Sequence, residues 1–101
     1  MICVFQQNVR IVDMNDEIIH ETVFEHGQFD SVIPTVGSSV VSHELGLRQF
    51  EVVLDKRPGK TARYKIVDVE YDILGEKVRV TAQLEAITLI VGQHDVGLIN
   101  S

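Results

Sequence analysis

The 101-residue sequence has little cysteine, proline and tryptophan, and the scarcity of cysteine limits what the protein can be. Cys3 is the only cysteine, so an intramolecular disulfide is impossible. A lone thiol among apolar neighbours indicates a reduced core residue, which fits the cytoplasmic location that we expect. No basic n-region precedes a long apolar stretch, so we expect no signal peptide. The longest apolar stretch, residues 86–91, is too short to span a bilayer, so we expect no membrane partner.

Sequence signatures of enzymes are also missing. The chain has no nucleophile elbow, phosphate loop, dinucleotide fingerprint or zinc-ligand spacing. His20 and His26 flank Glu21 and Glu25, but adjacent residues of a strand point to opposite faces. A metal-binding or small-molecule-binding protein therefore remains only a third alternative. We expect no enzymatic activity, no cofactor and no metal.

Positive charge is missing from one continuous part of the chain. Residues 13–30 contain six acids and no Lys or Arg, so this acidic segment carries the whole net charge of −6. A net negative charge disfavours nonspecific binding of nucleic acid. It allows a basic protein partner, or it serves only to keep a face solvated.

The apolar residues that are present favour strands. Valine and isoleucine dominate the 45% of apolar residues, and β-branched side chains pack well on pleated strands. Turn signals recur about every ten residues, as in small all-β folds. The clearest alternation runs over residues 78–86, which we expect to form a central strand. Its inward residues would be Val78, Val80, Ala82, Leu84 and Ala86.

A second long strand is expected over residues 63–73, with a change of phase. Tyr64 and Ile66 share one parity, whereas Val67 and Val69 share the other. A strand with a period of two cannot bury both sets on one face, so we expect a bulge or a change of face near Ile66 and Val67.

The remaining elements are expected from shorter signals. Residues 38–50 form either a hairpin turning at residues 44–46 or a short helix capped by Ser38 or Ser39. The other expected elements are a strand at 9–12 with 2–5 as an extension, a turn at 13–16, a strand at 18–24 ended by residues 26–28, a crossing segment at 32–37, and a strand at 50–54 with Phe50, Val52 and Leu54 on one face.

These elements predict one all-β domain over residues 1–101, with the short helix as the alternative noted above. A small, strongly bent antiparallel barrel, SH3-like or OB-like, would hide its strand edges. The crossing Pro34-Thr35-Val36-Gly37, the strand from Arg63 to Tyr71 and the pair Val78 and Val80 resemble small barrel proteins of phages and bacteria that mostly lack assigned functions. The resemblance covers about half the chain and implies a fold, not an active site.

The most concentrated basic feature is the segment 55–65. It contains five bases and one acid, with Tyr64 among them, on an expected hairpin. An exposed hairpin of this kind could bind phosphate or an acidic protein surface, and its tyrosine could stack on a base. A solvated hairpin tip whose charges deter edge pairing is the alternative.

We therefore expect a non-enzymatic protein-binding module, such as a phage- or bacteria-encoded inhibitor or accessory factor. A barrel that binds single-stranded nucleic acid through residues 56–65 is the second hypothesis. Residues 87–91 must be covered either by barrel closure or by a second copy, so a homodimer is also considered. The candidate partner-binding residues are Lys56, Arg57, Lys60, Arg63, Tyr64, Asp16, Glu17, Glu21 and Glu25.

Overall fold

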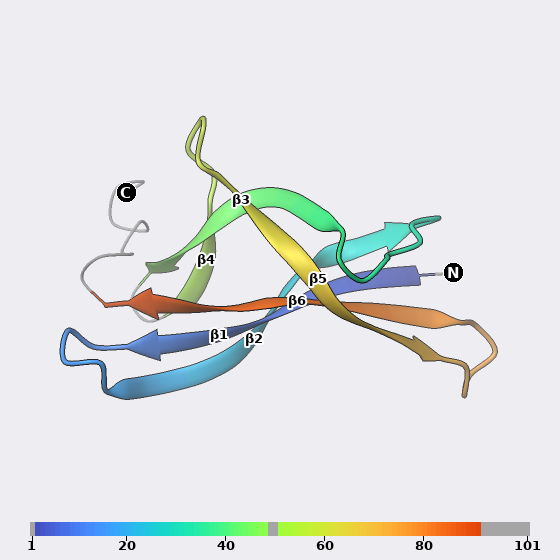
Figure 1. The fold of residues 1–101 in the computed structure, drawn as a ribbon, viewed down its shortest axis with the longest axis horizontal. Coiled ribbons are helices and arrows are strands. Elements are labelled where there is room, and N and C mark those ends of the chain that lie inside the picture. The colour runs from blue at the N-terminus through green and yellow to red at the C-terminus, as the bar shows by residue number, and fades with distance from the viewer. Residues whose placement is uncertain (1, 49–50, 92–101) are drawn as a thin grey trace.

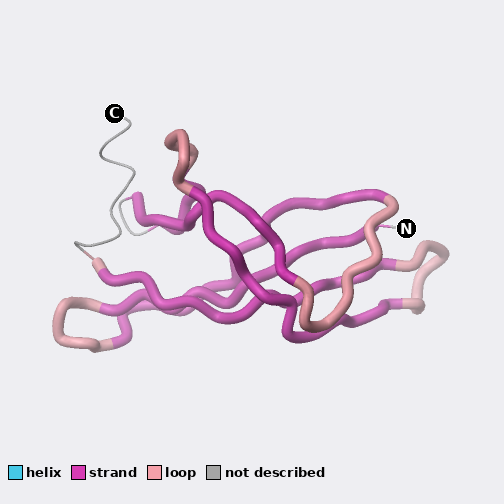
Figure 2. Tube along the Cα trace, turned by 45° about the horizontal axis from the view of Figure 1, so that its top comes forward, coloured by secondary structure: helices cyan, strands magenta, loops and turns pink. Residues whose placement is uncertain are grey.

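Six strands and no helix make up the part of the chain that the computed structural model describes, residues 2–48 and 51–91 (Figures 1 and 2). The all-β prediction is confirmed. The strands are β1 (Ile2–Val12), β2 (Ile18–Asp30), β3 (Ser39–Arg48), β4 (Glu51–Asp55), β5 (Thr61–Asp72) and β6 (Arg79–Ile90).

The strands form one mixed sheet in the order β2-β1-β6-β5-β3-β4, which curls into a nearly closed barrel (Figure 1). β6 lies third in this order, so its expected central position is confirmed. β1 and β6 run parallel, whereas every other neighbouring pair is antiparallel. The parallel pair brings the first and last strands of the chain together, which no local sequence signal indicates.

The alternation of β6 is confirmed for its first half and changes at a bulge. Val80, Ala82 and Leu84 are buried. The pairing with β1 then shifts between Gln7 and Val9, so that two β6 residues stand opposite one β1 residue. Two residues expected to face inward are exposed instead. Ala86 lies at the bulge, and Val78 precedes the first residue of the strand.

The phase change expected in β5 is confirmed as a second irregularity. The register with β6 shifts between Ile66 and Asp68, and it leaves Tyr64 and Ile66 buried while Val67 is exposed.

The crossing segment expected at residues 32–37 joins β2 to β3. The Gly37 N–H donates to the Ile66 carbonyl at 2.8 Å, and the Gly37 φ of 94° is one that glycine adopts without strain.

The expected break at residues 26–28 is wrong, because the chain bulges there instead of ending the strand. β2 continues to Asp30, and its pairing with β1 steps from Gly27 to Glu25 over one residue of β1. His26 is the extra residue. Gly27, at φ 133°, supplies the backbone conformation that an L side chain rarely adopts.

Neither expectation for residues 38–50 is correct. β3 is a continuous strand from Ser39 to Arg48, and Gly46 pairs with Val53 instead of forming a turn. The first half of β3 pairs with β5 and the second half with β4, so the strand changes neighbour after His43. The sheet bends where β3 changes neighbour. Because β3 is continuous, the chain makes no turn at residues 44–46. The face expected for Phe50 lies outside the described residues.

Two apolar clusters fill the barrel. One contains Cys3, Phe5, Tyr64, Ile66 and the first buried residues of β6, and the other contains Val9, Ile11, Leu45, Leu47 and Leu89. Ile87 packs against both clusters. Leu89 is buried in the second cluster, and the partly buried Val91 packs against it. Thr88 is exposed, so the barrel covers the stretch 87–91 only in part.

Truncation of Leu84 tests the assignment of the core. This side chain is 1% exposed in the centre of the sheet, so Leu84→Ala should lower the free energy of unfolding by about 2–5 kcal/mol through lost burial and a residual cavity. Thr88→Ala, at an exposed position of the same strand, should change it by less than about 0.5 kcal/mol. Urea denaturation measures both, and equal effects would contradict the assigned faces.

Candidate functional site: charged hairpins and an interior polar chain

The acidic segment lies on the β1–β2 hairpin. At its tip the Asp13 carboxylate accepts the backbone N–H groups of Asn15 at 2.8 Å and of Glu17 at 3.0 Å. Asp16 adopts a φ of 64°, which suits an Asp in a tight turn. The turn predicted at residues 13–16 is thus confirmed, and it presents the Asp16 and Glu17 side chains to solvent.

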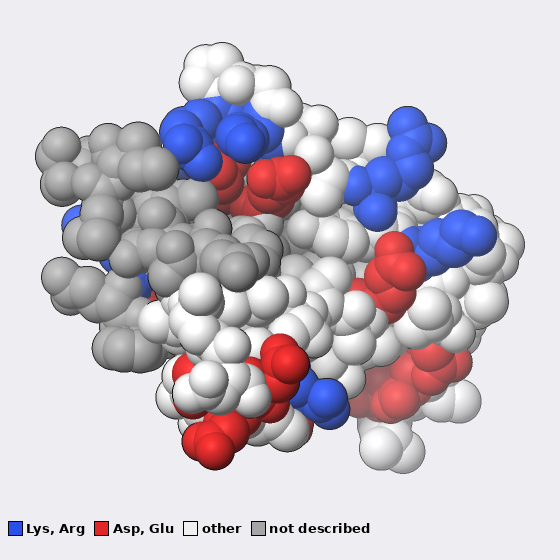
Figure 3. Space-filling model, turned by 60° about the vertical axis from the view of Figure 1, so that its left-hand side comes forward, with Lys and Arg blue, Asp and Glu red and all other residues white. Residues whose placement is uncertain are grey.

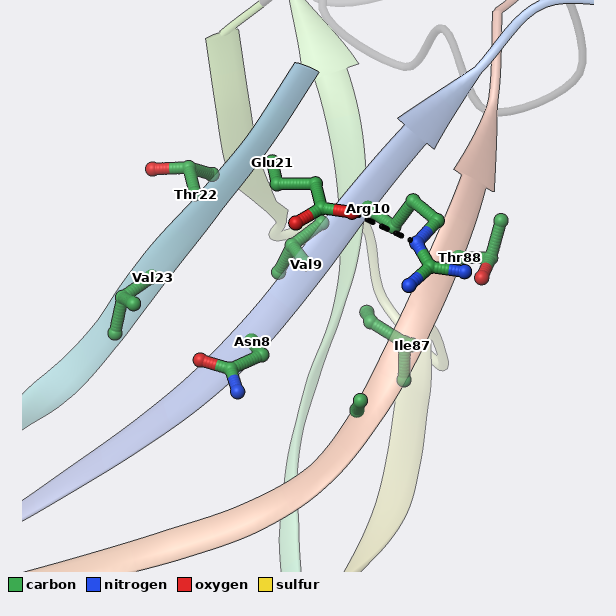
Figure 4. A pocket seen from close by; sticks show the side chains of 9 residues that line it. Asn8, Val9, Arg10, Glu21, Thr22, Val23, Ile87 and Thr88 are labelled. Atoms are coloured by element: carbon green, nitrogen blue, oxygen red, sulfur yellow. Dashed lines mark hydrogen bonds and ion pairs between the residues drawn. The ribbon is translucent and has the colours of Figure 1, made fainter. Parts of the chain in front are cut away.

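Two further candidates, Glu21 and Glu25, are exposed on the outer face of β2. Glu21 accepts the Arg10 Nε–H at 3.2 Å, but both side chains are more than half exposed, so the pair adds little stability. The pair borders a hollow of about 430 Å³ over β2, β1 and β6 (Figure 4). Asn8, Val23 and Thr88 also line this hollow.

The hairpin expected over residues 55–65 is wrong, because β4 and β5 each pair with β3 and not with each other. The basic candidates lie on the β4–β5 loop, residues 56–60 at the top of Figure 1, and on the start of β5, and they are not equivalent. Lys56, Lys60 and Arg63 are exposed. Arg57 instead stabilises the loop, because its guanidinium binds the buried Asp55 carboxylate through Nη2–Oδ2 at 2.7 Å and Nε–Oδ1 at 2.9 Å. The Arg57 hydrogen bond, opposed in part by burial, lowers the pKa of Asp55 to about 2.

Tyr64 is not available for stacking on a nucleic-acid base. Its side chain is 7% exposed and belongs to the first apolar cluster, where its ring centroid lies 5.8 Å from that of His26. Burial, the largest of several effects, raises the pKa of the Tyr64 phenol. The expected basic surface therefore consists of Lys56, Lys60 and Arg63, joined by the exposed Lys65.

The β1–β2 hairpin and the β4–β5 loop point to different parts of the surface (Figure 1). On the face shown in Figure 3, most Asp and Glu side chains lie in the lower part and most Lys and Arg side chains in the upper part.

A chain of polar side chains crosses the barrel interior. Gln7 is fully buried, and its Nε2 donates to the backbone carbonyl of Glu85 at 2.8 Å. Gln7 Oε1 lies 2.8 Å from His26 Nε2, and His26 Nδ1 lies 3.3 Å from Ser42 Oγ. We refer to Ser42, His26, Gln7 and the Glu85 carbonyl as the interior polar chain.

In a neutral imidazole, these contacts determine which nitrogen carries the proton. Burial lowers the pKa of His26 and so favours the neutral ring. Gln7 uses its amide N–H on the Glu85 carbonyl, so its oxygen accepts from His26 Nε2–H. In the neutral ring His26 Nδ1 then has no proton and accepts from the Ser42 hydroxyl.

Sequence reasoning gave His26 no role, because it did not expect the metal site that would include this residue, and it missed Gln7 and Ser42. Gln7 occupies an inward position of β1 between Phe5 and Val9, and a glutamine at an apolar position of an alternating strand is the signal that could have indicated it. His26 has the same parity on β2 as the inward Thr22 and Phe24, and it continues their face at the point where the strand bulges.

The other reactive side chains remain separate from one another. The Cys3 thiol is buried, and burial raises its pKa, as expected for a core thiol. The described residues contain no group of three or more His, Cys, Asp or Glu side chains that could hold a metal ion. Over the same residues, no helix has the length and hydropathy needed to cross a membrane.

Comparison with protein-family models, curated proteins and solved structures finds no match to this chain.

The neutral His26 makes stability depend on pH. The pKa of His26 lies below its ordinary value of 6.5 in the folded chain. At a pH between the pKa of the folded chain and that of the unfolded chain, the unfolded chain therefore binds a proton that the folded chain does not. The contribution of His26 to stability is complete above pH 6.5 and decreases as the pH falls below it. Stability should therefore decrease from about pH 7.5 to about pH 5.5 in urea denaturation, and less so in His26→Gln.

The exposed His43 provides the control, because His43→Gln should leave the pH profile close to that of the unmodified chain. Asp55 does not contribute to the pH dependence in this range, since the stability gained from its ionised carboxylate is lost only below the ordinary pKa of 3.8. Identical pH profiles for His26→Gln and the unmodified chain would contradict a buried neutral imidazole.

Proposed function

We propose that the protein is a non-enzymatic protein-binding module that contacts a basic partner through the acidic β1–β2 hairpin. The observation that carries the proposal is the placement of Asp16, Glu17, Glu21 and Glu25 on one exposed hairpin. The acidic segment of this hairpin carries a charge equal to the net charge of the whole chain. Charge concentrated on one side of a small protein steers a partner of opposite sign and sets its orientation.

The β4–β5 loop and the start of β5 form the second contact surface in this proposal. The exposed bases of this surface are Lys56, Lys60, Arg63 and Lys65, while Arg57 keeps the loop in shape through Asp55. Two surfaces of opposite sign allow a partner, or two partners, to be bound in a defined orientation. Weak self-association between the acidic hairpin of one copy and the basic surface of another belongs to the same proposal.

Cellular setting and origin are part of the proposal. The buried lone thiol of Cys3 supports a cytoplasmic location. The resemblance to small barrel proteins of phages and bacteria supports a role as an inhibitor or accessory factor encoded by such a genome. An acidic surface of this kind competes for protein surfaces that otherwise bind a polyanion.

Nucleic-acid binding by the β4–β5 loop and the start of β5 is the weaker alternative. Exposed lysines and arginines favour phosphate contacts, but the burial of Tyr64 removes the aromatic platform on which the alternative depended. Binding of a metal or small molecule would depend on His20 and His26, and His26 already bonds to two side chains.

Binding of charged probes tests the proposal. A fluorescent oligolysine peptide should bind in a salt-sensitive manner, and Glu17→Gln/Glu21→Gln/Glu25→Gln should weaken binding about tenfold because it removes three charges from the contact surface. Fluorescence anisotropy at low and moderate salt measures the affinities.

The matched control is Asp68→Asn/Glu70→Gln/Glu76→Gln, which removes three exposed acids from β5 and the loop that follows it. This variant has the same net charge as the first and should retain most of the binding. Equal losses in both variants, or tighter binding of an oligothymidine than of the peptide, would contradict the proposal.

A further inference from the structure

The barrel is left open between β2 and β4. These strands stand at the two ends of the strand order, and the described residues contain no pairing between them. β2 is 13 residues long and is paired only with β1 within the described part of the chain, so its other edge presents backbone N–H and C=O groups. A long unpaired edge is a template for one more strand.

A hollow lies along this edge. It has a volume of about 360 Å³, and it is lined by His20, Thr22, Val23 and Phe24 of β2 and by Glu51 and Val52 of β4. Phe24 and Val52 are partly buried and pack against the second apolar cluster. A side chain that enters the hollow from an added strand would therefore contact apolar atoms continuous with the core.

The outer side of the same edge is acidic. Glu21 and Glu25 alternate with the inward Thr22 and Phe24 on β2, and the acidic segment has no Lys or Arg. Two copies joined edge to edge through β2 would bring these acids together, and like charges on paired strands are destabilising. The same acids favour a basic strand, because opposite charges across a strand pair stabilise it.

We propose that the free edge of β2 binds an extended segment of a partner protein as an added strand in which basic and apolar residues alternate. Adjacent side chains of a strand point to opposite faces, so the Lys or Arg residues would lie beside Glu21 and Glu25 on the outside. The alternating apolar residues would enter the hollow between Phe24 and Val52. This inference rests on the proposed function and specifies the class of partner.

A peptide of about nine residues in which Lys and Val alternate provides the probe. It should bind at least about tenfold more tightly than a shuffled peptide of the same composition, because only alternation places all valines in the hollow. Amide hydrogen exchange of β2 should slow in the complex, whereas exchange in the β4–β5 loop should not change.

Backbone methylation separates strand addition from simple charge attraction. Two versions of the peptide carry N-methyl groups on either the Lys or the Val nitrogens, which lie on opposite edges of a strand. Only one edge faces β2, so one version should lose binding and the other should keep it. Glu21→Gln/Glu25→Gln should weaken binding about tenfold, and the matched control Glu70→Gln/Glu76→Gln should not.

The outcomes distinguish this inference from the proposed function. Equal binding of the alternating and shuffled peptides, without slower exchange in β2, would overturn the added strand and leave charge-driven binding in place. Failure of every basic peptide to bind would overturn both proposals. A dimer of the unmodified chain that protects β2 amides from exchange would also overturn this inference, because a second copy would then occupy the edge.

Discussion

A buried glutamine is the constraint on which the arrangement of the barrel depends. Gln7 lies in the interior between the two apolar clusters, where an amide without partners would be costly. Its N–H donates to the Glu85 carbonyl at the bulge of β6, and its oxygen accepts from His26 at the bulge of β2. Both partners of the buried amide therefore come from positions where a strand bulges.

The interior polar chain also joins parts of the barrel that backbone pairing leaves apart. β2 and β3 are not neighbours in the sheet, yet His26 of β2 contacts Ser42 of β3 at 3.3 Å. This contact joins β2 to β3 through side chains, while the outer edge of β2 remains unpaired in the described residues. A barrel closed by backbone pairing would hide that edge, whereas a barrel held by side chains can leave it exposed for a partner.

Local patterns predicted much of the fold, because alternation and phase are properties of neighbouring residues. The parity of Tyr64, Ile66 and Val67 indicated the irregularity of β5, and the alternation through Leu84 indicated the central strand. The sequence did not distinguish a glycine that ends a strand from one that permits a bulge, so Gly27 was misread as a break. The correct assignment depends on whether a neighbouring strand continues past the glycine, and that is tertiary information.

The candidate site was predictable in part for the same reason. Charge is additive along the chain, so the acidic and basic segments were visible in the sequence, and the structure leaves Glu25 and Lys60 exposed as such segments suggest. The roles of Arg57 and Tyr64 were not visible, because the burial of Asp55 and the packing of Tyr64 against His26 depend on distant parts of the chain. The order of the strands, which is tertiary information, places the edge of β2 opposite β4.

The protonation state of His26 tests the interior polar chain most directly. Long-range proton–nitrogen correlation spectra at neutral pH report which imidazole nitrogen carries the proton. The hydrogen bonds of Gln7 require a proton on Nε2, and the neutral ring then leaves Nδ1 to accept from Ser42. A neutral ring protonated on Nδ1, or a doubly protonated ring at neutral pH, would contradict the interior polar chain.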